Sequence, residues 1–487
     1  MEEHRLTKLK NLLDLHVNPY VNSFKVATSI DKITLTYNNC SHDDLLNNKY
    51  RYTVAGRIYA IRNFGKVSFL TLKDYTGTIQ VYVRAKDITE QDKQVFDNIE
   101  VGDFSAFSGY LFKTKTGELT ICAEAVKILT KSLNDLPEKW HGLKDTEKRL
   151  RQRYLDILVN EDAKSVFLKR SKIIQLLRDY FIKNNYLEVE TPMMQPLPGG
   201  ATANPFETYH NTLDMKLYLR IAPELYLKRL VIAGFEKVFE INRNFRNEGI
   251  SSRHNPEFTM VEWYTAYRDY YDLMDMTEEL INFISLQLHN NRELSFNENR
   301  IDLTPPWPKL SLIDAIKTYT DINIVDLYDI NKAKKIAEQS NIEIEENISV
   351  GKIIVKVFEK FVEEKLIKPT FIIDYPKDVS PLSKAKENNK DIAERFELYI
   401  GGMEIANGFN ELNDPAEQKL RFEEQVKNKE DKEVDYDYIR ALEYGLPPTA
   451  GEGLGIDRLV MLFTNKSSIR DIILFPQLKK DDMNSTI

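Results

Sequence analysis

Five stretches of the sequence between residues 51 and 130 alternate apolar with polar residues and are rich in aromatic and β-branched side chains. Such alternation is typical of β-strands that bury one face. Turn-forming residues separate the stretches, and a polar segment of helical composition at 87–99 follows the third. The stretches cover residues 51–62, 67–75, 78–84, 104–113 and 118–129. The sequence therefore predicts a small five-stranded β-domain with one helix after its third strand.

This strand pattern is typical of an OB-fold barrel, and such barrels commonly bind single-stranded nucleic acid. An SH3-like or other small barrel fits the same strand count, so the pattern alone leaves both folds open. The net charge of −8 argues against a nucleic-acid partner. The charge is unevenly spread, however, because residues 1–130 hold 17 Lys and Arg against 15 Asp and Glu, whereas the remainder holds 50 against 60. A mildly basic N-terminal region is compatible with RNA binding.

The length of 487 residues exceeds what one compact core holds, so at least two domains are expected. After the β-domain the pattern changes to alternating helical and strand-like pieces, which predicts an α+β multidomain protein. The expected parts are a helical N-terminal extension at 1–48, the barrel at 49–130, a charged linker at 131–160 and an α+β domain at 161–487 with a helix-rich insertion at about 311–368.

Targeting signals and cysteines constrain the compartment. We find no run of about 18 apolar residues and no apolar signal-peptide core, so no membrane association is expected. Two cysteines, Cys40 and Cys122, are too few for a disulfide framework or a structural zinc site, which favours a reducing compartment. We expect a cytoplasmic protein.

A polar segment with three arginines lies between two strand-like runs at 239–260. Arg243, Arg246 and Arg253 carry the side chain best suited to bidentate binding of phosphate. Phe258, which opens the second run, has a ring that can stack on a base. For any single residue here, a solvated hairpin loop over a core phenylalanine is the stronger interpretation.

An acidic segment at 397–404 contains a Gly-Gly pair that suits a two-residue hairpin turn. Such a turn places Tyr399 opposite Glu404 and puts Glu397 on the same face as Tyr399. The two glutamates are then diagonal neighbours about 7–8 Å apart at Cα, and they repel unless a cation bridges them. Mg²⁺ bound to one or two carboxylates plus nucleotide phosphates would relieve that repulsion. An exposed acidic hairpin without metal is the alternative, and these residues alone favour it.

A glycine-rich segment at 451–455 precedes an apolar helix that has Arg458 near its start. Glycines allow a backbone to approach a ligand closely. The spacing matches neither a dinucleotide-binding fingerprint nor a Walker A loop, so the segment is a weak signal by itself. We predict a glycine-rich turn leading into a final helix.

Together and in this order, these segments resemble the signature motifs of class II aminoacyl-tRNA synthetases. The helix from about 165 that ends at 189–192 would be motif 1, whose proline, here Pro192, lies at the dimer interface in that family. Residues 245–248 are similar to motif 2 and residues 453–458 to motif 3. This family has a subclass of aspartate, asparagine and lysine enzymes. Within it, the chain resembles the lysine enzymes at residues 198–201, 222–228 and 406–414.

The resemblance implies an OB-fold anticodon-binding barrel joined to an antiparallel-sheet catalytic domain flanked by helices. It implies a homodimer that activates L-lysine with ATP and Mg²⁺ and esterifies it to tRNA(Lys). Arg246 would act on the α-phosphate, while Phe258 and Arg458 would enclose the adenine.

The remaining site residues follow from the same resemblance. The ATP-binding set is Arg246, Glu248, His254, Asn255, Phe258, Glu404, Gly455 and Arg458. The lysine-binding set is Gly200, Glu224, Glu262, Tyr264, Asn407, Phe409 and Glu411. Mg²⁺ would be bound by Glu397 and Glu404. The anticodon would be read by Arg62, Phe69 and Gln80.

The chemistry of the lysine set supports this substrate independently, because a buried ammonium must be paired with anions and acceptors. By resemblance, Glu411 and Tyr264 would bind the ε-ammonium. The alternative for Glu262 and Tyr264 is an amphipathic surface helix over 261–274, and the alternative for Phe69 is a core position. Rival functions are an aspartate or asparagine synthetase of the same architecture, an enzyme that transfers lysine to a protein, and a non-catalytic RNA-binding scaffold.

Overall fold

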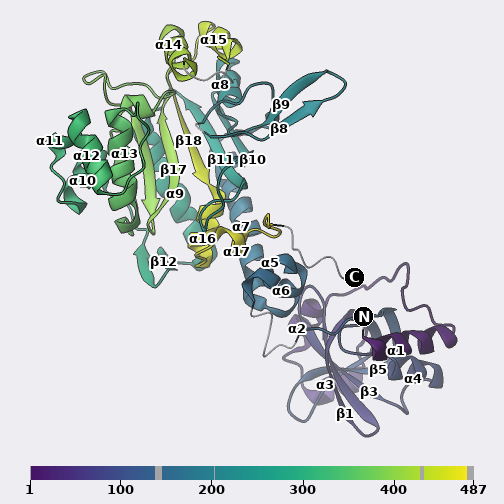
Figure 1. Cartoon of the computed structure of the whole chain (residues 1–487). Helices are drawn as coiled ribbons and strands as arrows, with labels where there is room; N and C mark the ends of the chain where they lie inside the picture. Colours follow the sequence, from purple (N-terminus) through teal and green to yellow (C-terminus); the bar gives the residue numbers. More distant parts are fainter. Residues whose placement is uncertain (1, 138–144, 202, 428–432, 480–487) are drawn as a thin grey trace. The chain divides into compact units, whose positions relative to one another are not determined.

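The computed structural model describes residues 2–137, 145–201, 203–427 and 433–479, which form two compact units, 1–144 and 145–487 (Figure 1). The middle of the predicted linker, 138–144, lies outside the described residues. No helix in the described part of the chain is long and apolar enough to span a bilayer.

The N-terminal unit contains a closed barrel with the strand order β1-β2-β3-β5-β4. All neighbouring strands are antiparallel except the pair β3 and β5. The prediction of an OB-fold with a helix after the third strand is confirmed. Its elements are β1 (Arg51–Phe64), β2 (Val67–Lys73), β3 (Thr78–Arg84), α4 (Glu90–Asp97), β4 (Phe104–Lys113) and β5 (Leu119–Thr130).

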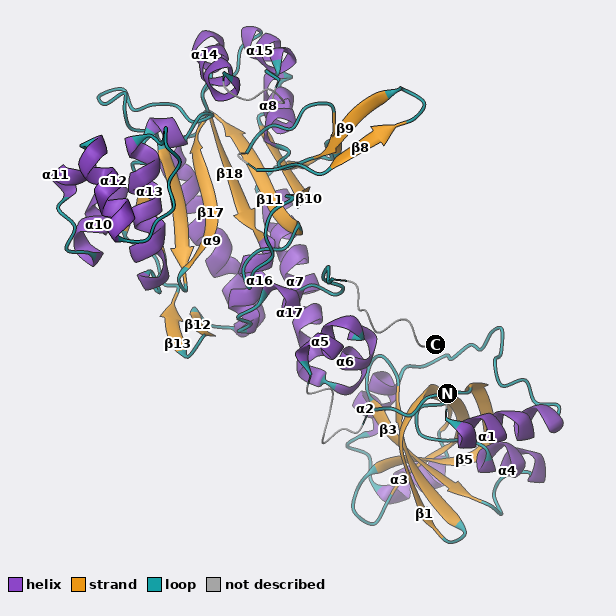
Figure 2. Ribbon diagram, viewed as in Figure 1, coloured by secondary structure: helices purple, strands orange, loops and turns teal. Residues whose placement is uncertain are grey.

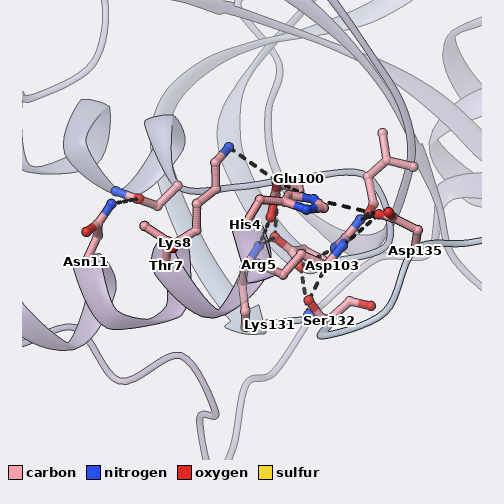
Figure 3. Close-up of polar contacts among 12 residues, drawn as sticks. His4, Arg5, Thr7, Lys8, Asn11, Glu100, Asp103, Lys131, Ser132 and Asp135 are labelled. Carbon is pink, nitrogen blue, oxygen red and sulfur yellow. Dashed lines mark hydrogen bonds and ion pairs between the residues drawn. The ribbon is translucent and has the colours of Figure 1, made fainter. Parts of the chain in front are cut away.

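Three helices precede the barrel: α1 (Glu3–Asp14), α2 (Ile30–Tyr37) and α3 (His42–Asn48). A buried ionic cluster fixes α1 to the barrel (Figure 3). Arg5, only 3% exposed, donates to Asp135 Oδ1 at 2.7 Å and to the carbonyl oxygen of Val101 at 2.7 Å. Beside it, Lys131 Nζ donates to Asp103 Oδ2 at 2.9 Å and to Glu100 Oε2 at 2.7 Å.

The C-terminal unit is built on an eight-stranded sheet of order β14-β15-β16-β17-β18-β11-β10-β6 (Figure 2). The six central strands are antiparallel to their neighbours, whereas the edge strands β14 and β6 pair in parallel. The strands are β6 (Leu187–Glu188), β10 (Lys237–Phe245), β11 (Glu257–Ala266), β14 (Lys309–Ser311), β15 (Thr370–Ile373), β16 (Arg395–Ile400), β17 (Met403–Asn410) and β18 (Thr449–Gly455).

Helices α7 (Glu161–Lys183), α9 (Tyr270–His289) and α16 (Ile456–Thr464) share one hydrophobic core with this sheet. Alternation along β11 explains the division of its faces, because Val261 and Trp263 are buried in that core while Glu262 and Tyr264 point to the other side. The predicted α+β domain, an antiparallel sheet with flanking helices, is confirmed.

The remaining elements surround the sheet, and the hairpin β8–β9 extends away from it (Figure 1). The helices of the predicted insertion have their own apolar core. These elements are α5 (Thr146–Arg151), α6 (Arg153–Val159), β7 (Met194–Gln195), β8 (Glu207–His210), β9 (Met215–Leu219), α8 (Glu224–Ile232), β12 (Glu293–Phe296), β13 (Asn299–Asp302), α10 (Leu312–Tyr319), α11 (Ile324–Leu327), α12 (Ile330–Gln339), α13 (Val350–Phe361), the 3₁₀ turns Glu363–Lys365 and Lys377–Val379, α14 (Pro415–Val426), α15 (Tyr436–Glu443) and α17 (Ile469–Ile472).

The glycine-rich segment differs from the expected turn, because it forms the central strand β18 between β17 and β11. Glycine is unfavourable in a strand unless space demands it. A Cβ on Gly451 would lie 2.3 Å from both Glu411 Oε1 and the Tyr264 ring. The glycine is therefore required by close packing within the sheet.

Candidate active site

A cavity of about 1550 Å³ opens on the sheet face opposite α9 and is lined by strands β11, β16, β17 and β18. Fifteen of the sixteen site residues predicted for this unit line it; they are Gly200, Glu224, Arg246, Glu248, His254, Asn255, Phe258, Glu262, Tyr264, Glu397, Glu404, Asn407, Phe409, Gly455 and Arg458. Glu411 lies beneath the cavity wall, fully buried. The sheet therefore brings residues from distant parts of the chain into one site.

One half of the cavity carries arginines. The Arg246 guanidinium carbon lies 5.0 Å from the centroid of the Phe258 ring. Arg458 Nη1 donates to Glu404 Oε2 at 2.9 Å, and its Nη2 lies 3.2 Å from His254 Nε2. Burial, with the charge of Arg458, lowers the pKa of His254, and Nε2 is the acceptor in this contact because a guanidinium can only donate. Cationic groups with exchangeable partners suit an anionic ligand such as a triphosphate.

A buried brace lies behind these arginines. Asp457, 3% exposed, accepts from Arg170 Nη1 at 2.5 Å and from the backbone N–H of Thr259 at 2.8 Å. Arg170 Nη2 also donates to Thr259 Oγ1 at 3.0 Å. Because Thr259 follows Phe258 and Asp457 precedes Arg458, the brace connects α7 to both residues predicted to enclose the adenine.

The acidic hairpin has the predicted turn, with Tyr399 opposite Glu404, but the prediction that Glu397 is the diagonal neighbour of Glu404 is wrong. A bulge at Ile405 lies beyond that pair and leaves Glu397 opposite Asn407. The Glu397 carboxylate accepts from Tyr375 at 2.8 Å and from Tyr399 at 2.6 Å, and it pairs with Arg395. Both glutamates face the cavity.

Two further carboxylates lie near this hairpin. Burial raises the pKa of Glu359, and repulsion from Glu397 adds to the rise. Burial and repulsion from Glu404 raise the pKa of Glu363 to about 7. Such an excess of negative charge, presented on carboxylate oxygens, fits a hard divalent cation such as Mg²⁺. Of the two predicted ligands, Glu404 is the more accessible, because Glu397 is 9% exposed and its oxygens already have partners.

The other half of the cavity is anionic and buried. Burial and repulsion from Glu224 and Glu240 raise the pKa of Glu262 to about 8. Burial likewise raises the pKa of Glu411 to about 8, against the opposing effect of Lys228. Glu411 Oε1 is buried and has no hydrogen-bond partner among the described residues. An unpaired buried carboxylate oxygen is costly unless a donor binds it, so this atom marks a site for a cationic group.

The barrel presents the three predicted anticodon residues on one outer face. Arg62 lies opposite Phe69 across β1 and β2, and Phe69 lies opposite Tyr82 across β2 and β3. The Phe69 and Tyr82 rings are 5.0 Å apart, and Gln80 is on the same face of β3. Phe69 is half-buried and alternates with buried Leu70, so it is not a core residue.

Two family models match the chain: tRNA synthetases class II (D, K and N) over residues 145–479, and the OB-fold nucleic acid binding domain over residues 52–129. The chain belongs to the class II tRNA synthetases of the D, K and N group. It is 50% identical to a lysine--tRNA ligase of Pelotomaculum thermopropionicum, over 98% of this chain and 94% of the relative. It is 48% identical to a lysine--tRNA ligase of Magnetococcus marinus, over 98% of this chain and 96% of the relative.

The sequence did not identify several polar residues of this synthetase site, namely Arg170, Lys228, Glu359, Glu363 and Arg395. A signal existed for Lys228, because it follows Glu224 by four residues in a helix, a spacing that pairs acid with base. Its burial and its second partner depend on the tertiary fold. Arg395 donates to Asn407 at 3.0 Å, a contact that only the β16–β17 register creates.

Proposed function

We propose that this class II synthetase is a lysine–tRNA ligase, which activates L-lysine with ATP and transfers the lysyl group to the 3′ end of tRNA(Lys). The observation that carries the substrate is the buried anionic half of the cavity, above all the unpaired Oε1 of Glu411 beside the Tyr264 ring. The relatives named lysine--tRNA ligase, about 50% identical over nearly the whole chain, support the same substrate.

In the lysine half, Glu411 and Tyr264 bind the ε-ammonium of the substrate. Gly200, Glu224 and Glu262 surround the α-amino group, and Asn407, Phe409 and Arg246 lie near the carboxylate. Gly200 fits this position because its φ of +85° suits glycine and a Cβ would lie 3.0 Å from that of Glu224.

In the ATP half, Arg246 stabilises the α-phosphate as the lysine carboxylate attacks it, and Phe258 and Arg458 enclose the adenine. Glu248, His254, Asn255 and Gly455 complete the nucleotide site. Glu397 and Glu404 would hold Mg²⁺, which when bound neutralises and orients the triphosphate. We assign no general base, since positioning and charge neutralisation supply the catalysis.

The barrel binds the anticodon of tRNA(Lys) through Arg62, Phe69 and Gln80. A base stacks on Phe69 while Gln80 hydrogen-bonds the edge of that base, as in other single-stranded RNA sites. Phe69→Ala is expected to weaken aminoacylation by about 1–3 kcal/mol while leaving lysine-dependent pyrophosphate exchange intact. An equal loss in both assays would instead give Phe69 a structural role.

The assembly is a homodimer formed through the motif-1 region around Pro192. Five apolar side chains in this part of the chain are exposed, which suits a surface that a second copy covers; they are Leu168, Ile182, Leu187, Met193 and Met194. Sedimentation of the full chain should give twice its mass of 56.8 kDa. We also propose a cytoplasmic location and the division into extension 1–48, barrel 49–130, linker 131–160 and catalytic domain 161–487.

Pyrophosphate exchange with each of the twenty amino acids tests the substrate. We expect exchange with L-lysine that exceeds exchange with aspartate and asparagine by several orders of magnitude. Preferential exchange with aspartate or asparagine would overturn the assignment, and no exchange with any amino acid would favour a non-catalytic protein.

A further inference from the structure

Behind the anionic half of the cavity lies a lysine side chain of the protein itself. Lys228 is fully buried, and its Nζ donates to Glu224 Oε1 and to Glu411 Oε2, each at 2.8 Å. Its Nζ also lies 5.4 Å from the centroid of the Tyr438 ring. Both carboxylates that bind Lys228 belong to the residues proposed to bind the substrate.

Lys228 keeps its positive charge despite its burial. Burial alone would lower its pKa, but Glu224 and Glu411 offset that effect and raise the pKa of Lys228 well above its ordinary value. Each carboxylate therefore has one oxygen fixed by a permanent cation. The other oxygen of Glu411 has no partner among the described residues and lies against Gly451 and the Tyr264 ring.

Without Lys228, Glu224 and Glu411 would share a dry site with no cation between them. Two such carboxylates repel, and at least one takes up a proton. A protonated Glu411 is a poor anchor for an ammonium group, because it has lost its charge and its hydroxyl requires an acceptor. The ion pair with Lys228 opposes that outcome, because its charge counteracts the rise that burial causes in the pKa of both carboxyl groups.

Resting on the proposed function, we infer that Lys228 is a positioning residue for lysine recognition, a built-in counter-ion between Glu224 and Glu411 that favours their charged form and fixes the orientation in which they bind the substrate. It acts on specificity through these two residues and does not touch the reacting atoms.

Among the described residues, no other cation that faces Glu224 and Glu411 can replace the Lys228 ammonium as their partner. Arg395 acts on Glu224 at longer range, but it is committed to Glu397 and Asn407. The charged and titratable groups facing Glu224, Lys228 and Glu411 are Glu262 and Tyr264 of β11, Arg395 of β16 and Tyr438 of α15.

The main test is Lys228→Met in the full chain, assayed by lysine-dependent pyrophosphate exchange from pH 6.5 to 9.5. At pH 7.5 we expect the lysine KM to rise by about tenfold or more, with the ATP KM changed less than about twofold. The rise of lysine kcat/KM with pH should move upward by about one unit, because the carboxylates now keep their protons longer. The deficit should therefore shrink toward pH 9.5.

The matched control is Lys131→Met in the barrel unit. Lys131 is also fully buried between two carboxylates, Glu100 and Asp103, but it lies outside the catalytic unit. Its loss should lower thermal stability while leaving the lysine KM and its pH profile unchanged. Lys228→Arg, which keeps the charge, should keep the wild-type pH profile even if the lysine KM changes.

Chemical rescue supplies a second readout. In Lys228→Ala, methylammonium can enter the space of the missing side chain, and we expect it to recover part of the lysine kcat/KM but to recover nothing in Lys131→Ala. If Lys228→Met does not fold, the double variant Lys228→Met/Glu224→Gln removes both members of the ion pair. Its lysine kcat/KM should rise at a higher pH than that of Glu224→Gln alone.

An unchanged lysine KM and pH profile in folded Lys228 variants would overturn the inference and give Lys228 a purely structural role. Parallel losses for lysine and ATP at every pH would overturn it as well. The proposed function fails separately, because it requires lysine to be the preferred amino acid of the unmodified enzyme whatever Lys228 does.

Discussion

The charged side chains in the two halves of the cavity differ in how deeply they are buried. In the lysine half the Lys228 and Glu411 side chains are 0% exposed and already paired. In the ATP half the corresponding ion pair, Arg458 with Glu404, is 21% and 38% exposed. Buried charges interact strongly but tolerate no missing partner, whereas exposed pairs exchange partners at little cost.

Because the two halves differ in burial, we expect the lysine half to determine amino-acid selectivity and the ATP half to permit fast exchange of ligands. A dry, prearranged pocket discriminates between side chains, because a substrate that leaves its buried groups unpaired is rejected. A half-open site with arginines can exchange a carboxylate for the phosphates of ATP and release pyrophosphate again. If the two halves are as separate as their burial implies, a change in one half should leave the KM for the substrate of the other half nearly unchanged.

The largest effect is expected in the buried half. Glu411→Gln removes the charge facing the ε-ammonium and leaves Lys228 with a single carboxylate, at a cost of roughly 3–5 kcal/mol in lysine use. Steady-state exchange should show this loss in lysine kcat/KM with the ATP KM nearly unchanged. Glu443→Gln, exposed on α15, is the control. A lysine KM and kcat equal to wild type would remove Glu411 from the pocket.

The exposed half should respond through its metal requirement. Glu397→Gln and Glu404→Gln are each expected to raise the Mg²⁺ concentration needed for exchange. The double variant should cost much less than the sum of the single losses, because both residues act on one ion. Mg²⁺ titrations of the three variants, with exposed Glu338→Gln as control, give the result. Additive losses at an unchanged Mg²⁺ requirement would show that the glutamates do not share a metal.

The brace behind the adenine should affect the ATP half alone. Arg170→Met removes the partner of Asp457 and loosens Phe258 and Arg458, so the ATP KM should rise by about tenfold, or about 1.4 kcal/mol. The lysine KM should stay within about twofold, and Arg170→Lys should recover part of the loss. Lys172→Met, exposed on the same helix, controls for general effects on α7. Equal changes in both KM values would mean that the halves are coupled through α7.

The smallest effect is a pH dependence that only one half should show. Glu262 and Glu411 have pKa values raised to about 8, and the lysine ammonium groups bind the ionised carboxylates. Lysine kcat/KM should therefore rise between pH 6.5 and about 8 while protons are released on binding. ATP kcat/KM should change less above pH 7, since arginine is charged across this window and Glu363, the carboxyl group near the acidic hairpin whose pKa is about 7, has lost most of its proton by then. The pH profiles of kcat/KM test the first expectation, and calorimetry in two buffers measures the protons released on lysine binding. Parallel pH profiles for lysine and ATP would contradict the prediction.

Features that depend on local sequence were predictable. Alternation defined the barrel strands, and the Gly401–Gly402 pair predicted the turn and the Tyr399–Glu404 pairing next to it, although not the bulge at Ile405 that shifts the register beyond that pair. Of the site residues that the family resemblance named in the C-terminal unit, all but Glu411 line one cavity. The roles of these residues in binding ATP, lysine and Mg²⁺ are suggested by the motifs and are compatible with the geometry. They remain predictions that the assays above test.

Features that depend on tertiary packing were not predictable. The strand β18 was expected to be a glycine-rich turn, and the closeness of Glu411 and Tyr264, which explains the glycine at 451, is visible only in the folded structure. For Lys228 the local sequence offers only the four-residue spacing from Glu224, since the burial of the side chain and its partner 183 residues away depend on the tertiary fold. A single sequence shows which charges exist but not which of them face each other in a dry interior.

The attachment of α1 has a consequence for synthesis of the protein. Arg5 bonds to Asp135, 130 residues later in the chain. At about 5–20 residues per second, roughly 6 to 26 seconds of translation separate these two residues. The bond that ties α1 to Asp135 can therefore form only after all five barrel strands have been synthesised.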